Sequence, residues 1–304
     1  MTFNTPIFEG TAVALVTPFT EDGSAVDFAG LAALCDMQIK AGIDALIICG
    51  TTGEASTMPD AEHVQVISEA VKAAGGKVPI IAGTGSNDTR HAVHLATEAE
   101  RVGADALLVV TPYYNKTSQS GLVEHFKASA SAVDLPVILY NVPSRTAMNI
   151  DPETLLRLAP VENIVGMKEC NFNQLNRNMS LCGSRYHYWS GEDGLVVPLM
   201  AMGGQGVISV IANVLPELTI AMTHAWLAGD HDQARRLQVE LEPLIEACFC
   251  EVNPIPVKYA MNRAGLQAGP CRLPLVSISP DHAAFVDRVL VSYDLLPGED
   301  AVHA

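Results

Sequence analysis

Short apolar segments alternate with longer amphipathic segments along most of the chain. Eight short segments consist mainly of apolar, β-branched or aromatic residues, most of them Val, Ile, Leu and Ala, and each ends at a polar or Gly-rich turn. Because successive residues are apolar, these segments predict strands that are buried on both faces, as in parallel sheets. The predicted strands are Thr11–Thr17, Ala45–Cys49, Ile80–Thr84, Ala106–Val110, Val137–Asn141, Ile164–Lys168, Tyr186–Ser190 and Gly206–Val210.

The segments between these strands have the period of amphipathic helices. In Asp27–Ala41, apolar side chains such as Leu31, Leu34 and Cys35 recur close to every 3.6 residues. Further helices are predicted at Ala61–Ala74, Arg90–Arg101, Gly121–Ala132 and Pro152–Leu158.

Regular alternation of strand and helix predicts parallel pairing through right-handed crossovers. Eight such units favour a closed (β/α)8 TIM barrel. An open doubly wound sheet is the alternative, but the first turn, Thr17–Gly23, lacks the Gly-rich fingerprint that often begins such folds. After about Pro216 only helices are predicted, at Leu218–Ala228, Asp232–Cys250 and Pro256–Ala264. We therefore expect an α/β protein with a barrel domain over 1–229 and a C-terminal helical domain over 230–304.

The amino-acid composition and net charge indicate the class of protein and exclude some kinds of binding partner. Of the 304 residues, 49% are hydrophobic and 17% are charged, which is typical of an enzyme with a large core. The net charge of −16 argues against nucleic acid or an anionic membrane as a partner. No apolar segment reaches transmembrane length, and the first residues lack the pattern of a signal peptide. We expect a cytoplasmic protein.

The seven cysteines and nine histidines do not form metal-binding patterns. No CxxC pair occurs, and Cys248 and Cys250 have no second pair at ligand spacing. The sequence therefore predicts free thiols in a reducing compartment and neither a metal nor another cofactor.

Lys168 is the lysine that ends a buried apolar segment. Chemistry in a barrel takes place at the carboxyl ends of the strands. Desolvation there lowers the pKa of an amine, so that it attacks carbonyl groups and forms imines. An ion pair between Lys168 and Glu169, or another acid at the barrel mouth, is an equally good interpretation of position alone.

Other strand ends carry groups that suit an anionic substrate, each with a structural alternative. The loop Gly50–Glu54 offers amides and hydroxyls for a carboxylate, or is a simple turn. Tyr114 and Tyr140 can relay protons, although tyrosines at strand ends more often pack in the core. Arg145 can hold a carboxylate through two hydrogen bonds, or form a structural salt bridge.

Several ordered motifs resemble the dihydrodipicolinate synthase family of pyruvate-dependent lyases and synthases. The likeness runs through nearly the whole chain. Its motifs are Val16–Pro18, Gly50–Glu54, Ile81–Gly85, Thr111–Asn115, Tyr140–Thr146, Gly166–Glu169, Gly203–Val210 and Asn253–Lys258.

This resemblance implies a lyase that joins pyruvate to L-aspartate 4-semialdehyde, giving 4-hydroxy-tetrahydrodipicolinate for lysine and diaminopimelate synthesis. It implies that Lys168 forms the imine with pyruvate and that Tyr140 moves protons around it. Thr51 would link Tyr140 to Tyr114, which reaches in from the neighbouring subunit of a homotetramer, a dimer of dimers.

The same resemblance implies the substrate contacts. Thr52 would bind the pyruvate carboxylate, and Arg145 the carboxylate of the aldehyde. Gly191 and Ile208 would line the pocket. Sugar-acid aldolases and N-acetylneuraminate lyases share the lysine and tyrosine but accept polyhydroxylated chains, so Arg145 favours the short acceptor. A paralogue that has lost catalysis is disfavoured, because all these strand-end residues are present.

Two departures from the family pattern bear on acceptor choice and regulation. Phe172 stands where the family usually has a small residue. Lysine-sensitive members commonly have histidine in place of Asp60 and glutamate in place of His91, so we expect weak or absent inhibition by lysine. The expected effector site comprises Ala55, Ser56, Asp60, His63, Asn87, His91 and Tyr113.

Overall fold

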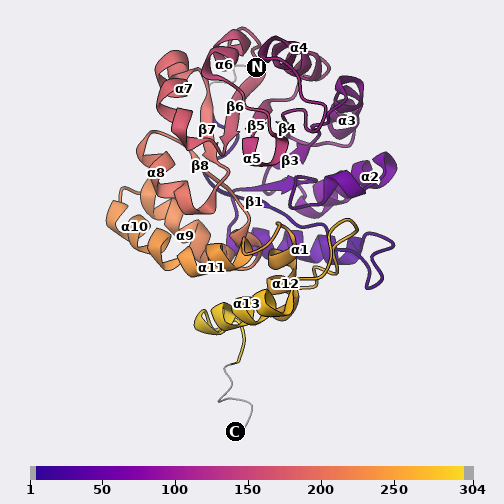
Figure 1. Ribbon diagram of the computed structural model, residues 1–304, viewed down its shortest axis with the longest axis vertical. Helices are drawn as coiled ribbons and strands as arrows, with labels where there is room; N and C mark the ends of the chain where they lie inside the picture. Colours follow the sequence, from indigo (N-terminus) through magenta and orange to yellow (C-terminus); the bar gives the residue numbers. More distant parts are fainter. Residues whose placement is uncertain (1–4, 298–304) are drawn as a thin grey trace.

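A closed parallel barrel forms the centre of the molecule. The computed structural model describes residues 5–297, and within them eight parallel strands pair in chain order, with β8 closing onto β1 (Figure 1). This closure confirms the predicted barrel and excludes the open sheet. The strands are β1 Gly10–Ala14, β2 Ala45–Ile48, β3 Ile80–Gly83, β4 Ala106–Val110, β5 Val137–Asn141, β6 Ile164–Glu169, β7 His187–Ser190 and β8 Gly206–Ser209.

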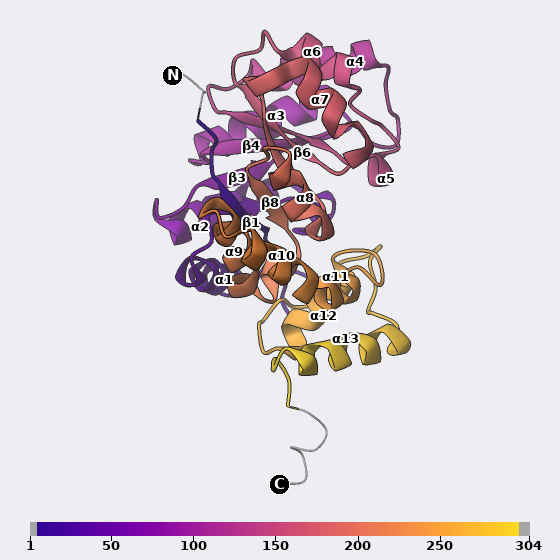
Figure 2. The same ribbon diagram turned by 90° about the vertical axis from the view of Figure 1, so that its left-hand side faces the viewer.

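Helices surround the barrel and extend beyond one side of it. Figures 1 and 2 both place α12 and α13 together, on the side of the molecule where α1 and α11 lie. The helices described within 5–297 are α1 Phe28–Ala41, α2 Asp60–Ala74, α3 Thr89–Arg101, α4 Gln119–Ala130, α5 Pro143–Thr146, α6 Pro152–Leu158, α7 Leu175–Cys182, α8 Val196–Ala201, α9 Pro216–Leu227, α10 His231–Glu240, α11 Glu242–Cys248, α12 Ile255–Arg263 and α13 Pro280–Ser292.

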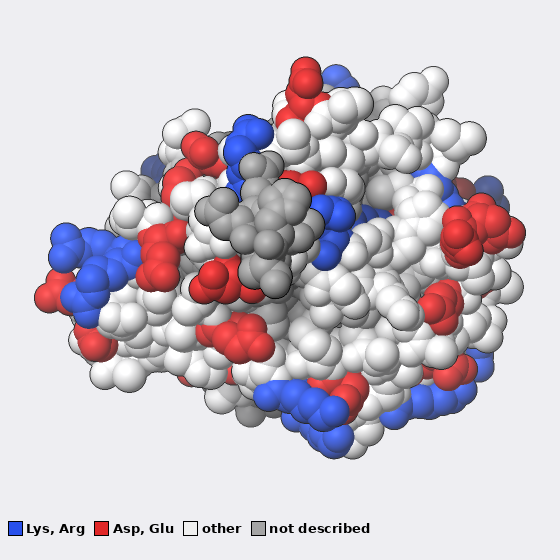
Figure 3. Space-filling view, turned by 90° about the horizontal axis from the view of Figure 1, so that it is seen from below, with Lys and Arg blue, Asp and Glu red and all other residues white. Residues whose placement is uncertain are grey.

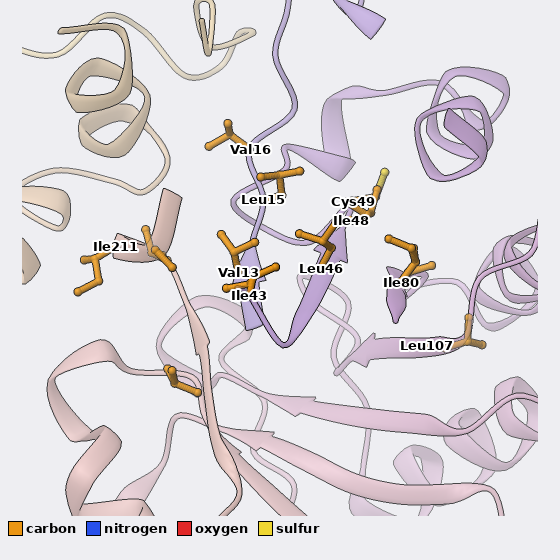
Figure 4. Packing of buried hydrophobic residues seen from close by; sticks show 14 of the residues in the cluster. Val13, Leu15, Val16, Ile43, Leu46, Ile48, Cys49, Ile80, Leu107 and Ile211 are labelled. Carbon is orange, nitrogen blue, oxygen red and sulfur yellow. The ribbon is translucent and has the colours of Figure 1, made fainter. Parts of the chain in front are cut away.

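Strand residues divide between two apolar layers. On β2, Ala45 and Ile47 pack in the barrel interior, whereas Leu46 and Ile48 pack in the layer between barrel and helices. Figure 4 shows this outer layer, where Leu46 and Ile48 lie near Val13. Alternate side chains point to opposite faces of a strand, so a continuous apolar strand fills both layers.

The amino end of the barrel interior is filled by an aromatic pair. Phe8 precedes β1, and its ring stacks on that of Trp189 with 5.0 Å between centroids. The Trp189 indole also donates to the Phe8 carbonyl over 3.2 Å. Both side chains are buried. This packing fills the interior below Lys168 and leaves the carboxyl ends of the strands to form the site.

Two predicted elements differ most from the structure, whereas the other predicted elements differ by at most two residues at an end. β1 ends at Ala14 rather than Thr17, because the amide of Val16 donates to Asn213 Oδ1 (3.1 Å) instead of to a neighbouring strand. The helix predicted over Asp232–Cys250 is two helices, α10 and α11, which meet at Leu241. Pro243 lacks the N–H that a continuous helix would need at that point.

The helices after β8 do not all have the same neighbours. α9 packs against β1 and α10 packs against α9, whereas α11, α12 and α13 pack on one another. The proposed domain boundary at 229/230 lies in the turn between α9 and α10, and residues 298–304 of the proposed second domain lie outside the described range. α13 was not predicted.

Charged side chains are spread over the face shown in Figure 3. Acidic and basic groups lie in small clusters there, and broad uncharged areas separate the clusters. Within residues 5–297, no helix has the length and apolar character needed to cross a membrane.

Candidate active site

Lys168 projects into the barrel interior at the carboxyl end of β6. The register of β5 and β6 places it directly beside Tyr140. Its side chain is only 6% exposed, and its Nζ lies 4.4 Å from the centroid of the Tyr140 ring. An amine and a phenol from neighbouring strands therefore meet in a nearly dry site.

Burial lowers the pKa of Lys168, and Arg145 acts in the same direction. Cys170, Asp193 and Glu192 oppose this shift. Among residues 5–297, no carboxylate lies within ion-pair distance of the Lys168 amine. A lower pKa increases the fraction of free amine near neutral pH, and the free amine is the nucleophile.

Glu169 points away from Lys168, so the ion pair weighed from the sequence does not form. Its Oε1 accepts from Asn141 (2.8 Å) and from the Asn171 amide (2.7 Å), while Oε2 accepts from Gln174 and Asn178 (3.0 Å each). Burial raises the pKa of Glu169 to about 7, although these donors favour the ionised form. The carboxyl group thereby ties the end of β6 to its surroundings and fixes the backbone that carries Lys168.

Tyr140 is buried and keeps its proton at neutral pH. Burial raises the pKa of its phenol, Cys170 adds to the shift, and both Arg145 and a hydrogen bond with the Thr51 hydroxyl reduce it. A protonated phenol beside a reactive amine can donate a proton and then accept one back.

A cavity of about 160 Å³ opens above Lys168. Lys168 and Tyr140 line it together with loop residues that follow other strands. These include Thr51 and Thr52 after β2, Arg145 on α5, and Gly191 after β7. The cavity suits a substrate of few atoms, and its lining combines hydroxyls and a guanidinium that favour carboxylates.

Position 191 has room only for glycine, because its backbone lies against the Lys168 side chain. A Cβ at this position would lie 2.3 Å from Cys170 Sγ and 3.1 Å from Lys168 Cε. No real Cβ approaches sulfur that closely, so any side chain here would displace the lysine or the thiol.

The loop after β2 is held from two sides. The Thr17 hydroxyl donates to the Gly53 carbonyl over 2.7 Å. Glu54 adopts φ +54°, and its carboxylate accepts from Lys258 Nζ over 2.7 Å. Both side chains of this ion pair are almost fully buried. The backbone that presents Thr51 and Thr52 is therefore anchored to the barrel and to α12.

A second cavity of about 370 Å³ shares Thr51, Tyr140 and Arg145 with the first. Of the predicted effector residues, Asn87 does not line it; its carbonyl instead accepts from Asn115 over 2.9 Å. The six that do line it are Ala55, Ser56, Asp60, His63, His91 and Tyr113. Their proposed regulatory role stays a prediction.

Three other predicted residues lie away from the lysine cavity. Tyr114 is 91% exposed and lines neither cavity. Ile208 is buried in the barrel interior, below the cavity lining. Phe172 packs against the outer core and lines neither cavity, so it does not narrow the site within this chain.

Two further residues contribute to the site but were not among the predicted site residues. Asn253 lines the cavity, and Asp193 supports the strand end beside it. Asn253 lines the lysine cavity from the segment before α12. Asp193 is buried, and its Oδ2 accepts from the Val210 amide over 2.9 Å, which fixes the end of β8. Spacing in one sequence gives no sign that a distant tail reaches the barrel mouth.

No group of three or more His, Cys, Asp or Glu side chains that could hold a metal ion occurs in residues 5–297.

Comparison with known proteins places the chain in one family. Residues 7–292 match the family model described as the dihydrodipicolinate synthetase family. The 4-hydroxy-tetrahydrodipicolinate synthase of Acetivibrio thermocellus is 53% identical over 291 residues, covering 96% of this chain and 99% of the relative.

Solved structures give the same result. Dihydrodipicolinate synthase from Aquifex aeolicus is 45% identical with a TM-score of 0.92, covering 95% of this chain and 99% of that one. The enzyme from Cyanidioschyzon merolae, solved with lysine bound, is 36% identical with a TM-score of 0.92, covering 96% and 100%. With the family model spanning nearly all of the described residues, this chain belongs to the dihydrodipicolinate synthetase family.

Proposed function

We propose that this chain condenses pyruvate with L-aspartate 4-semialdehyde to give 4-hydroxy-tetrahydrodipicolinate, through a Schiff base on Lys168. The observation that carries the proposal is the buried Lys168 amine, 4.4 Å from the Tyr140 ring, in a cavity that Arg145 also lines. Relatives named 4-hydroxy-tetrahydrodipicolinate synthase match nearly the whole chain and support the choice of substrates.

The first half of the reaction takes place at pyruvate. The free amine of Lys168 attacks the keto carbon, and loss of water leaves a protonated imine. This cation attracts electrons from the neighbouring methyl group, which loses a proton to give an enamine. Tyr140 supplies and removes protons at these steps, while Thr52 holds the pyruvate carboxylate.

The second half joins the two substrates. The enamine carbon attacks the aldehyde carbon, and the new oxyanion takes up a proton. The amino group of the former aldehyde then attacks the imine carbon, which closes the ring and releases the Lys168 amine. Arg145 orients the second carboxylate throughout, because a guanidinium can bind it through two parallel hydrogen bonds.

The test measures loss of aspartate semialdehyde with pyruvate, coupled to the reductase that consumes the product. Native protein and Lys168→Ala are compared, with exposed Lys40→Ala as the matched control. Turnover in the native and control proteins, absent from Lys168→Ala, is expected. If the folded native protein shows no turnover while borohydride still traps pyruvate on Lys168, the acceptor is wrong and sugar-acid aldehydes are the next choice.

We propose that the active form is a homotetramer, a dimer of dimers, in which Tyr114 of a neighbouring copy completes the relay with Thr51 and Tyr140. Tyr114 supports this because it is 91% exposed and has φ +68°, a strained conformation for a non-glycine residue. Sedimentation is expected to show a tetramer, and Tyr114→Phe is expected to lower kcat without changing the mass. A fully active monomer would overturn the proposal.

We propose a cytoplasmic location, because all seven cysteines are free thiols and suit a reducing compartment. Fractionation of cells that produce the protein tests this, and recovery outside the cytoplasm would overturn it.

We propose that lysine inhibits weakly or not at all. His91 Nε2 lies 2.9 Å from Asp60 Oδ1, and His94 Nε2 lies 3.7 Å from Oδ2. An effector ammonium would have to displace these histidines to reach the Asp60 carboxylate. A lysine titration of the rate tests this; inhibition at micromolar lysine that is abolished by changing His63 or Asn87 would contradict it.

A further inference from the structure

Among the described residues that line the lysine cavity, only Glu192 carries a carboxylate. Its side chain is partly exposed. Burial is the main cause of the pKa shifts of Lys168, Tyr140 and Cys170, and in all three the negative charge of Glu192 acts in the raising direction. A charge that acts on all three groups faces the site. The proposed reaction, as described above, assigns Glu192 no part.

The backbone of Glu192 is fixed at the end of β7. The Ser190 hydroxyl donates to the Glu192 carbonyl over 2.6 Å and accepts from the Glu192 amide over 3.1 Å. Ser190 is itself fully buried. With the backbone held in this way, rotation of the side chain decides whether the carboxylate faces the cavity or the solvent.

Cys170 stands beside both the lysine and the glutamate. Its amide donates to the Asn141 carbonyl over 3.0 Å, which extends the pairing of β5 and β6 by one residue. Alternate side chains of a strand share a face, so the thiol lies on the same side of β6 as Lys168. The Cys170 Sγ and the Lys168 Cε both lie close to the point where a Cβ of Gly191 would stand.

The Cys170 thiol donates a hydrogen bond to the Glu192 carboxylate. Burial raises the pKa of Cys170, so the thiol keeps its proton at neutral pH and acts as the donor. A partly exposed carboxylate is better solvated when it turns into water. The hydrogen bond from the thiol therefore keeps the carboxylate on the side of the lysine.

We propose that the Glu192 carboxylate is the counter-charge of the Lys168 cation, first as the ammonium and then as the protonated imine, and that Cys170 is the positioning residue that orients it. The imine part of this inference rests on the proposed function. Lys168 forms no ion pair within residues 5–297. Glu192 thus stabilises positive charge across the cavity without contacting the nucleophile, because opposite charges attract over several ångströms where water is largely excluded.

Asp193 and Arg145 are the rival charged groups that act on Lys168. Asp193 does not line the cavity, burial raises its pKa, and its Oδ2 accepts from the Val210 amide. Arg145 lines the cavity, but its positive charge disfavours a second cation. Glu192 is the negative group that the cavity itself presents to the lysine.

Acetylation by acetic anhydride measures the charge on Lys168 without any substrate. The anhydride is small and uncharged and reacts with the free amine, so the rate at this lysine, followed by peptide mass spectrometry across a range of pH, gives its pKa. The variants compared with the native protein are Glu192→Gln, Cys170→Ala, Cys170→Ser, the double variant Glu192→Gln with Cys170→Ala, and Asp193→Asn. Glu124→Gln changes an exposed glutamate on α4 and is the matched control.

In Glu192→Gln the pH of half-maximal acetylation is expected to fall by about 0.5 to 1, because the ammonium form loses a nearby negative charge. Cys170→Ala is expected to shift the profile in the same direction, since the carboxylate is released into solvent. Cys170→Ser keeps a donor and is expected to keep the native profile. The double variant is expected to shift no further than Glu192→Gln alone, because the thiol acts through the carboxylate.

Capture of methyl pyruvate with cyanoborohydride tests the imine. Amine, ketone and one proton give the imine cation and water, and the reagent then delivers hydride to the imine carbon. The ester is uncharged, so its imine brings no carboxylate of its own. At a pH above the pKa of Lys168, Glu192→Gln is expected to be captured about 3- to 10-fold more slowly than the native protein, because a neutral amine becomes a cation without its counter-charge.

Capture of pyruvate itself on Lys168 of the native protein is a separate measurement. Its failure would overturn the proposed function, whereas the acetylation profile would still test Glu192 and Cys170.

Four outcomes would overturn the inference. An unchanged acetylation profile in Glu192→Gln would remove the counter-charge, and a shift in Asp193→Asn alone would assign that role to Asp193. Equal shifts in Cys170→Ala and Cys170→Ser would mean that the thiol acts through its volume and not through its hydrogen bond. Undiminished capture of methyl pyruvate in Glu192→Gln would confine the charge effect to the free amine and contradict the imine part.

Discussion

Lys168 and Tyr140 occupy paired positions on β6 and β5, with the lysine Nζ 4.4 Å from the centre of the phenol ring. The ring face is the electron-rich part of the tyrosine and stabilises a nearby cation. The contact therefore favours the protonated imine as well as the ammonium form of the lysine. The phenol oxygen remains available for proton transfer at the cavity.

Replacing Tyr140 by Phe separates the stabilisation of the lysine cation by the ring from proton transfer by the hydroxyl. The ring stays under the lysine, so borohydride is expected to trap pyruvate on Lys168 as it does in the native protein. Loss of the hydroxyl is expected to lower kcat by about 10²- to 10⁴-fold, the usual range for general acid–base catalysis. Tyr186→Phe removes a buried hydroxyl far from the cavity and is the control. An unchanged kcat in Tyr140→Phe would contradict the proton-transfer role.

Arg145→Ala is expected to affect the second substrate more than the first. Removing a charge-assisted hydrogen bond to a carboxylate costs about 1.5–3 kcal/mol, or roughly 10- to 100-fold in kcat/KM for the aldehyde. Steady-state kinetics with each substrate varied in turn checks this, with exposed Arg157→Ala as the control. Equal effects on both substrates would assign Arg145 a general structural role.

Lys258→Met is expected to destabilise the fold by about 3–5 kcal/mol, because it leaves the buried Glu54 carboxylate without its partner. The double variant Glu54→Gln with Lys258→Met is expected to recover most of the loss. Urea unfolding provides the measurement. Lys40→Met breaks an exposed pair with Asp36 and should change the free energy of unfolding little. A similar loss of stability in Lys258→Met and Lys40→Met would show that burial is not the cause.

Glu169 is expected to make stability depend on pH. Its pKa in the folded state is about 7, above the ordinary value of 4.5. Between these values the native state holds a proton that the unfolded chain releases, so stability falls as pH rises through about 4.5 to 7. A shift of this size corresponds to roughly 3 kcal/mol.

Chemical unfolding at pH 5 and pH 8 tests the Glu169 prediction. The glutamine side chain in Glu169→Gln cannot ionise, so this variant should lose less stability between pH 5 and pH 8 than the native protein. An equal loss in native and variant proteins would mean that other groups cause the pH dependence.

The fold was largely predictable because its signals are local. A continuous apolar segment such as Ala106–Val110 fills both layers of the barrel, and its burial is visible in the sequence. Strand and helix ends depend on long-range partners instead. β1 ends early because Asn213, distant in the sequence, takes up the amide of Val16. The break between α10 and α11 was missed even though Pro243 marks it.

The site was predictable only where it follows strand ends. Lys168, Tyr140, Thr52 and Arg145 were found because a barrel gathers such positions at one end. The Lys168–Glu169 alternative stayed open because the predicted strand ended at Lys168. Neighbouring side chains in a strand point to opposite faces, and β6 continues through Glu169, so the two side chains diverge. Asn253 comes from the tail, and nothing local to it indicates the cavity.

The buried pair of Glu54 and Lys258 joins residues 204 positions apart. A chain leaves the ribosome from its amino end, and domains fold as they emerge. The loop of Thr51 and Thr52 is therefore synthesised long before the tail that fixes it. A nascent barrel with all eight strands would still carry the Glu54 carboxylate without its cation, so we expect the loop beside the active-site cavity to be fixed only after α12 has been synthesised.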